Sequence, residues 1–126
     1  MTRKEVFPFE ARDATTGATI TDTRLSTREY IGQRHCKIIE NRMRTVDESL
    51  VDSEGRLILD PDSASAELLK ELAEVGRREA PRHINLRHMA LLDAAGLATR
   101  SVGSRPGLVA YDITDLGRQF VRDLLP

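Results

Sequence analysis

The chain has 126 residues and is 40% hydrophobic with 4% aromatic residues, which suits one domain, or two very small units, with an aliphatic core. A net charge of −1 gives no overall positive field toward nucleic acid or membranes, and the single cysteine excludes an internal disulfide. No apolar run approaches the roughly 20 residues of a membrane span. The charged start MTRKE is not a secretory signal, so we expect a cytoplasmic protein.

The first third of the chain predicts a β-hairpin. Residues 5–12 and 18–24 are strand-like, and the turn-forming cluster DATTG lies between them. Pro8 interrupts the first run, which predicts that this strand is either an edge strand or bulged.

A short helix is predicted after the hairpin. The run from Ser26 to Glu29 fits the capping-box pattern S-x-x-E, so a helix over about 27–36 should bury Tyr30 and Ile31. Cys36, near its end, is expected to be a small core residue. A strand over 37–40 and an extended segment over 44–59, with a turn at 53–55, should follow.

The pattern breaks at Asp60-Pro61-Asp62-Ser63, where we expect a boundary between units 1–60 and 61–126. Asp62 or Ser63 is a suitable N-cap for a helix that stops near Gly76. The predicted fold class is therefore α+β, with an N-terminal ββαβ-like unit packed on the C-terminal unit.

The last third predicts helix, hairpin and helix in that order. A helix over about 86–95 ends at Gly96, and the extended runs 97–102 and 108–113 follow with a Gly/Ser/Arg/Pro loop between them. Thr114 and Asp115 then open a final helix, which should pack back on the helix before Gly76. Only eight residues, 77–84, lie between Gly76 and the segment that begins at Asn85, so a further helix there is expected to be one turn near 78–81, or a loop.

The segments RHMALLDAAGLATR and YDITDLGRQFV resemble a pattern of bacterial and phage winged-helix regulators, over about residues 64–125. The resemblance implies that Gly96 ends the recognition helix, Thr114 caps the last helix and Gly117 allows close packing. The expected core of this unit is Leu68, Leu72, Met89, Leu92, Leu97, Ile113, Phe120 and Leu124. Residues 1–60 resemble no family that we can name.

Charge is sorted along the near-neutral chain. The net charge is +4 over residues 24–44, −5 over residues 47–62 and +4 over residues 77–105. A small DNA-binding face needs only such a local basic patch.

The winged-helix resemblance assigns roles on double-stranded DNA. The start of the recognition helix enters the major groove, which makes Asn85, Arg87 and His88 the candidates for base edges. Three arginines before this helix would neutralise phosphates, and three wing residues would hold the backbone or the minor groove. In that order, these are Arg77, Arg78 and Arg82, then Arg100, Ser104 and Arg105. The first hypothesis is thus a sequence-selective DNA-binding regulator, acting as a homodimer to enlarge its footprint.

The second hypothesis is a protein-interaction module, for example a phage or accessory factor, in which the acidic segment 47–62 binds a basic partner of a host complex. We expect no enzyme, because the chain has no Walker A loop, no G-x-G-x-x-G and no G-x-S-x-G. Three histidines and one cysteine lack the spacing of a metal site, so neither metal nor other cofactor is expected.

Overall fold

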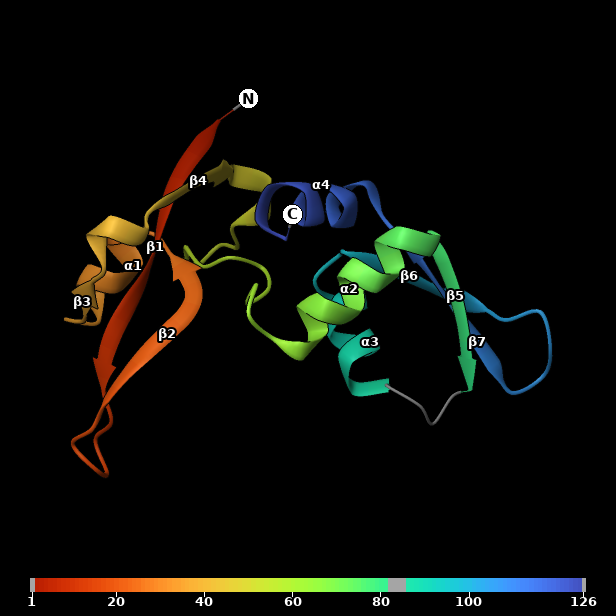
Figure 1. Cartoon of the computed structure of the whole chain (residues 1–126), viewed down its shortest axis with the longest axis horizontal. Helices are drawn as coiled ribbons and strands as arrows, with labels where there is room; N and C mark the ends of the chain where they lie inside the picture. The colour runs from red at the N-terminus through yellow and green to blue at the C-terminus, as the bar shows by residue number, and fades with distance from the viewer. Residues whose placement is uncertain (1, 82–85, 126) are drawn as a thin grey trace. The chain divides into compact units, whose positions relative to one another are not determined.

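The computed structural model describes residues 2–81 and 86–125, in two compact units, Met1–Asp60 and Pro61–Pro126 (Figure 1). Both units combine helices with antiparallel sheets, which confirms the predicted α+β class. The division falls at the sequence break predicted from Asp60 to Ser63.

Unit 1 (Met1–Asp60) is built around a single long strand. Its elements are β1 (Arg3–Arg12), β2 (Thr19–Ser26), α1 (Arg28–Gln33), β3 (Lys37–Ile38), η1 (Glu40–Arg42), β4 (Arg44–Asp47) and η2 (Glu48–Leu50). Strand β1 pairs antiparallel with β2, β3 and β4. The extended segment predicted over 44–59 forms a strand only over its first four residues, which are β4.

Pro8 lies in the central strand of unit 1, so the edge-strand prediction is wrong while the bulge is confirmed. The register between β1 and β2 shifts between Phe7 and Phe9. Strand β4 pairs with β1 only as far as Val6, and β3 pairs with it from Phe9. Pro8 therefore lies between the β4 and β3 pairings, where the sheet does not need the N–H that proline lacks. The Pro8 carbonyl accepts a hydrogen bond from the Ile39 amide at 3.0 Å.

Helix α1 starts one residue later than predicted and is shorter. Its N-cap is Thr27, whose hydroxyl accepts the Tyr30 amide at 3.3 Å. Ser26, the predicted cap, is instead the last residue of β2, where its hydroxyl donates to the Arg24 carbonyl at 3.0 Å. The helix ends by Arg34 because His35 takes a left-handed conformation with φ 55°.

The core of unit 1 includes an aromatic cluster. Phe7, Phe9, Tyr30 and Ile31 are all buried, as predicted for the last two. Cys36 is half-buried and packs against this cluster from its margin.

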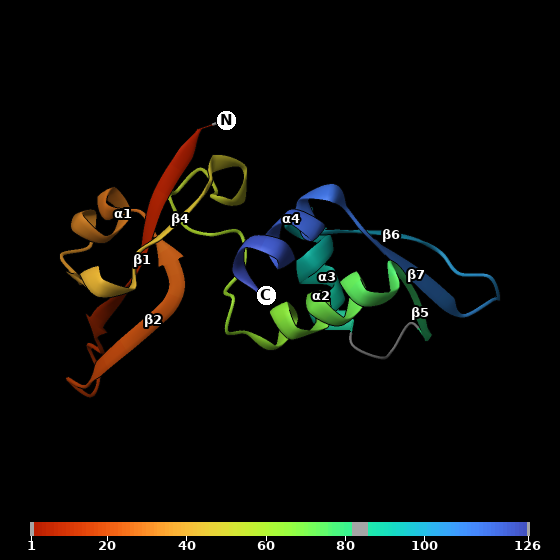
Figure 2. The same cartoon turned by 45° about the horizontal axis from the view of Figure 1, so that its top comes forward.

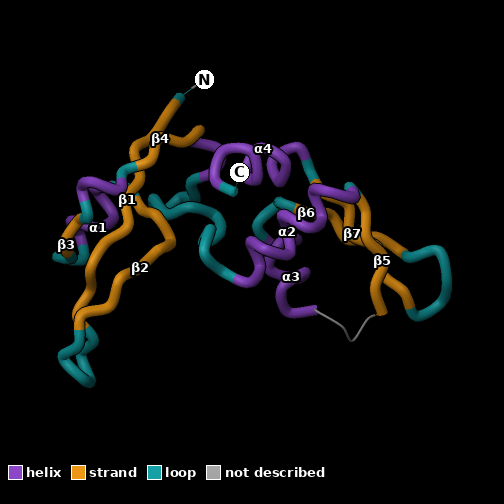
Figure 3. The backbone as a smooth tube through the Cα atoms, viewed as in Figure 1, coloured by secondary structure: helices purple, strands orange, loops and turns teal. Residues whose placement is uncertain are grey.

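Unit 2 (Pro61–Pro126) contains four segments whose prediction is confirmed in type and place, and one that is not. Its elements are α2 (Ala64–Val75), β5 (Arg77–Pro81), α3 (Leu86–Ala94), β6 (Ala98–Val102), β7 (Leu108–Ile113) and α4 (Asp115–Leu124). The three strands form a sheet in the order β5-β7-β6, visible in Figure 3. Helices α3 and α4 both pack on α2, and β6 and β7 extend as a hairpin beyond them (Figure 2).

Strand β5 corrects the prediction of a helical turn or loop near 78–81. Arg77 to Pro81 pair in continuous register with Asp112 to Leu108 of β7. Gly76 turns the chain out of α2 with φ 79°, and its carbonyl accepts the Ile113 amide at 3.0 Å, which sets the first rung. The pairing partner, rather than the sequence RREAP, makes this segment a strand.

The core of unit 2 is close to the predicted one. Seven of the eight expected residues are buried, and Ile113 is the exception because it is the half-buried last residue of β7. Tyr111 and Leu69 are fully buried and were not among the expected residues.

The residues of the winged-helix pattern meet at one junction. The Thr114 hydroxyl accepts the Gly117 amide at 3.0 Å, capping α4, and donates to the Gly96 carbonyl at 2.7 Å. The Thr114 amide donates to the Leu97 carbonyl at 3.1 Å. A Cβ on Gly117 would collide with that same Leu97 carbonyl. Gly96, Thr114 and Gly117 therefore connect α3, β6 and α4 at this junction.

Candidate nucleic-acid interface

Seven of the nine predicted DNA-contacting residues lie in the described part of unit 2, and Arg82 and Asn85 lie outside the described residues. The seven divide by environment: two arginines are in ion pairs, one histidine faces another helix, one serine is held by a carboxylate, and three arginines are exposed.

Arg77 and Arg78 are engaged within unit 2. Arg77 Nη1 lies 2.7 Å from Asp112 Oδ2, directly across the β5–β7 ladder. Arg78 Nη1 lies 3.5 Å from Glu71 Oε2 on α2. A phosphate would have to replace these carboxylates, so both arginines are weaker phosphate ligands than sequence alone suggests.

His88 points from α3 toward α2. Its Nδ1 lies 2.9 Å from the Ser65 hydroxyl oxygen, and its side chain is half-buried beside Glu67 and Glu71. This geometry joins two helices and turns the imidazole away from the exposed side of α3.

Ser104, in the turn between β6 and β7, is hydrogen-bonded to Glu79 of β5. Its amide and its hydroxyl each donate to one carboxylate oxygen of Glu79, both at 2.7 Å. These bonds keep the pKa of Glu79 below its ordinary value of 4.5, and the hydroxyl bond has the larger effect. The positive charges of Arg77 and Arg105 lower this pKa further. Sequence reasoning missed Glu79, since nothing local links it to a residue 25 positions away.

Arg87, Arg100 and Arg105 are the exposed members of the predicted set. They come from the first turn of α3, from β6 and from the turn between β6 and β7. Among the described residues, none of the three has a carboxylate within 4.0 Å. These guanidinium groups can therefore meet a phosphate without breaking an internal ion pair.

A groove lies between α3 and the β6–β7 hairpin. Asp93 of α3 lines one side, and residues of β6 and β7, among them Arg100 and Val102, line the other. The outward face of α3 is mostly apolar, with Ala90, Leu91 and Ala94 exposed. Among the exposed described residues of α3, only Arg87 has a side chain that can donate hydrogen bonds to a base edge.

The acidic segment 47–62 is partly used inside unit 1. Asp47, Asp52 and Asp60 all have internal partners. Asp47 accepts the Ser49 amide at 2.9 Å to cap η2, and hydrogen bonds from Ser49 lower the pKa of Asp47. Asp52 pairs with Arg24 at 3.1 Å. These three carboxylates stabilise turns of unit 1. A basic partner would therefore meet less free negative charge on this segment than its six acidic residues suggest.

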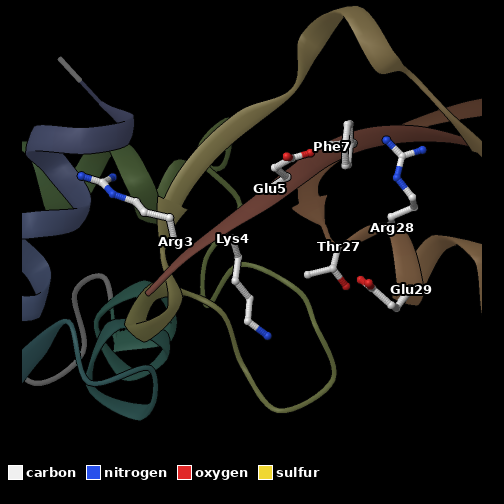
Figure 4. Close-up of a pocket in the computed structure, with 7 residues that line it drawn as sticks. All are labelled: Arg3, Lys4, Glu5, Phe7, Thr27, Arg28 and Glu29. Carbon is white, nitrogen blue, oxygen red and sulfur yellow. The ribbon is translucent and has the colours of Figure 1, made fainter. Parts of the chain in front are cut away.

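A second hollow lies on unit 1, where side chains of β1 and of the start of α1 surround it (Figure 4). Arg28, one of its lining residues, makes a bidentate ion pair with Glu40 at 2.7 and 3.0 Å and stacks over Phe7. This pairing raises the pKa of Arg28 and lowers that of Glu40, so the charge of Arg28 is already compensated by Glu40.

Among residues 2–81 and 86–125, no three His, Cys, Asp or Glu side chains are grouped to hold a metal ion. In the same part of the chain, no helix is long and apolar enough to cross a membrane. Comparison with known proteins finds no matching family model, no matching curated protein and no matching solved structure.

Proposed function

We propose that unit 2 is a winged-helix module that binds double-stranded DNA, chiefly through phosphate contacts from Arg87, Arg100 and Arg105. The observation that carries the proposal is the position of these exposed arginines on α3 and the wing, the two elements that contact DNA in this class of fold. The strand order β5-β7-β6 and the wing hairpin support the assignment of the class.

The composition of α3 favours limited base recognition. Ala90, Leu91 and Ala94 offer no hydrogen-bonding side chain, and the exposed Asp93 would repel phosphate. Selectivity for a sequence would therefore depend on DNA shape and on the predicted base contact of Asn85.

A salt titration tests the proposal. The full chain is titrated into a fluorescent random-sequence duplex at several salt concentrations, and log affinity should fall by about 0.9 per phosphate contact for each unit of log salt. The variant Arg87→Ala/Arg105→Ala should flatten this slope by roughly two contacts. The same titration should give two chains per duplex if the protein acts as a homodimer.

Arg118→Ala/Arg122→Ala is the matched control, because it removes the same charge from α4 and leaves α3 and the wing intact. Binding that is absent at low salt, or weakened equally by both double variants, would refute the proposed interface.

A protein-interaction function is the second candidate, and the apolar outward face of α3 favours it. Leu91 is 50% exposed and Val102 on the wing is 86% exposed. The titration separates the two functions, because a protein that binds only protein shows no salt-dependent duplex binding.

A further inference from the structure

Strand β1 of unit 1 runs on beyond its short partner β3. Strand β3 pairs only with Phe9 and Glu10, while β1 continues to Arg12. Next to this stretch is a hollow of about 360 Å³ whose lining includes Glu10, Arg12, Thr19, Arg34, His35 and Lys37. Three permanent cations and one carboxylate therefore share a single concave surface.

The guanidinium of Arg34 is fixed in orientation. It lies 3.6 Å from the centroid of the Tyr30 ring, and its Nη1 donates to the Tyr30 carbonyl at 3.4 Å. Tyr30 belongs to the buried core, so the ring is a rigid support. A guanidinium held in this way loses little side-chain entropy when it binds an anion.

The cations of the hollow make no direct ion pair, although Glu10 shares the lining and lies opposite Lys37 in the β1–β3 register. Among the described residues, no ion pair within 4.0 Å involves Arg12, Arg34 or Lys37. By contrast, three other arginines of unit 1 are in ion pairs, namely Arg24, Arg28 and Arg56.

The backbone adds a donor. The Pro8 carbonyl accepts from the Ile39 amide on the β3 side of β1, and the Asp13 amide donates to the Ala18 carbonyl on the β2 side. Since strand residues alternate, the even-numbered residues of this part of β1 direct their N–H groups toward β3. The Arg12 amide consequently points to the edge where β3 has already ended.

We propose that this hollow at the open edge of β1 is a binding site for a phosphate group. Two guanidinium groups, one ammonium, one hydroxyl and one backbone amide supply more donors than a carboxylate can use, and they suit the several oxygens of a phosphate. The site lies within unit 1 and does not depend on the function proposed for unit 2. The phosphate belongs either to a small phosphate ester or to a nucleic-acid backbone.

Inorganic phosphate is the first probe. It is titrated into the ¹⁵N-labelled full chain at constant ionic strength, and the amides of Arg12, Arg34 and Lys37 should shift saturably. Arg12→Gln/Lys37→Gln should weaken this binding roughly tenfold or more, because two charged donors are lost. Arg34 is kept in this variant so that the Tyr30 stack and the fold are preserved.

The control is Arg3→Gln/Arg42→Gln, which removes the same charge from exposed positions outside the hollow and should leave binding unchanged. Absence of saturable shifts, or equal weakening by both double variants, would overturn the proposal. A second titration, with a short duplex on the Arg87→Ala/Arg105→Ala background, separates the sources. Shifts at the same amides assign the site to backbone phosphate, and their absence alongside a response to inorganic phosphate assigns it to a small ester.

Discussion

Gly117 is the point where α4 lies against the chain that leads from α3 into β6. A methyl group there would overlap the Leu97 carbonyl and lie 2.8 Å from Ile113 Cγ1. The neighbouring Thr114 joins the same three elements through its hydroxyl and its amide. At the scale of single residues, unit 2 therefore depends on a few positions where size and hydrogen-bonding geometry are tightly restricted.

Gly117→Ala should lower the free energy of unfolding by about 1–3 kcal/mol, because the overlap outweighs the better helix propensity of alanine. Gly32→Ala is the control, since its Cβ meets nothing within 4 Å, and it should be neutral or stabilising by up to about 1 kcal/mol. Urea unfolding measures both. An equal response of the two variants would contradict the account of the junction.

Glu79 should make the turn between β6 and β7 sensitive to acid. Its pKa is lowered in the folded protein, so its bonds to Ser104 contribute stability above the ordinary pKa of 4.5 and are lost as pH falls through the lower folded value. The Ser104 amide resonance should titrate with a midpoint below 4.5, and Glu79→Gln should abolish that titration. A midpoint above 4.5 would show that the bonds do not favour the ionised carboxylate.

At the scale of elements, helix α1 carries an unfavourable ending. The amides of His35 and Cys36 bond back to the carbonyls of Gly32 and Ile31, an arrangement that requires a left-handed residue at position 35. Glycine fills that position at Gly96, after α3, where the same bonding pattern recurs. Helix α1 uses a histidine instead.

His35→Gly should therefore raise the free energy of unfolding by about 0.5–1 kcal/mol, because glycine takes the left-handed conformation without a Cβ clash. Gln33→Gly, two residues earlier at the last helical position of α1, should instead lower it, because glycine costs conformational entropy in a helix. Thermal and urea unfolding check both signs. Destabilisation by His35→Gly would mean that the imidazole makes a compensating contact.

The elements also show what the sequence could predict. Strong local signals, such as Ser63 before α2, Gly96 after α3 and Thr114 before α4, placed those helices correctly. Strand β5 was missed because its identity comes from β7, some 30 residues later. The Glu79–Ser104 and His88–Ser65 contacts were missed for the same reason, since both join distant parts of the chain.

At the scale of the whole molecule, the low net charge means that any nucleic-acid binding must arise from local geometry. The basic and acidic side chains of unit 2 balance, and several arginines of both units are consumed by internal ion pairs. The exposed cations that we propose to bind a ligand lie on α3 and the β6–β7 hairpin in one unit, and around the open edge of β1 in the other.

We propose above all that α3 and the β6–β7 hairpin bind DNA. The most direct measurement is a two-dimensional ¹H–¹⁵N spectrum of the full chain, recorded at low salt as an unlabelled duplex is added. We predict that the largest shifts in unit 2 fall on the amides around Arg87, Arg100 and Arg105 and that added salt reverses them. Shifts confined to α4 and the exposed face of α2, or no shifts at low salt, would contradict the account.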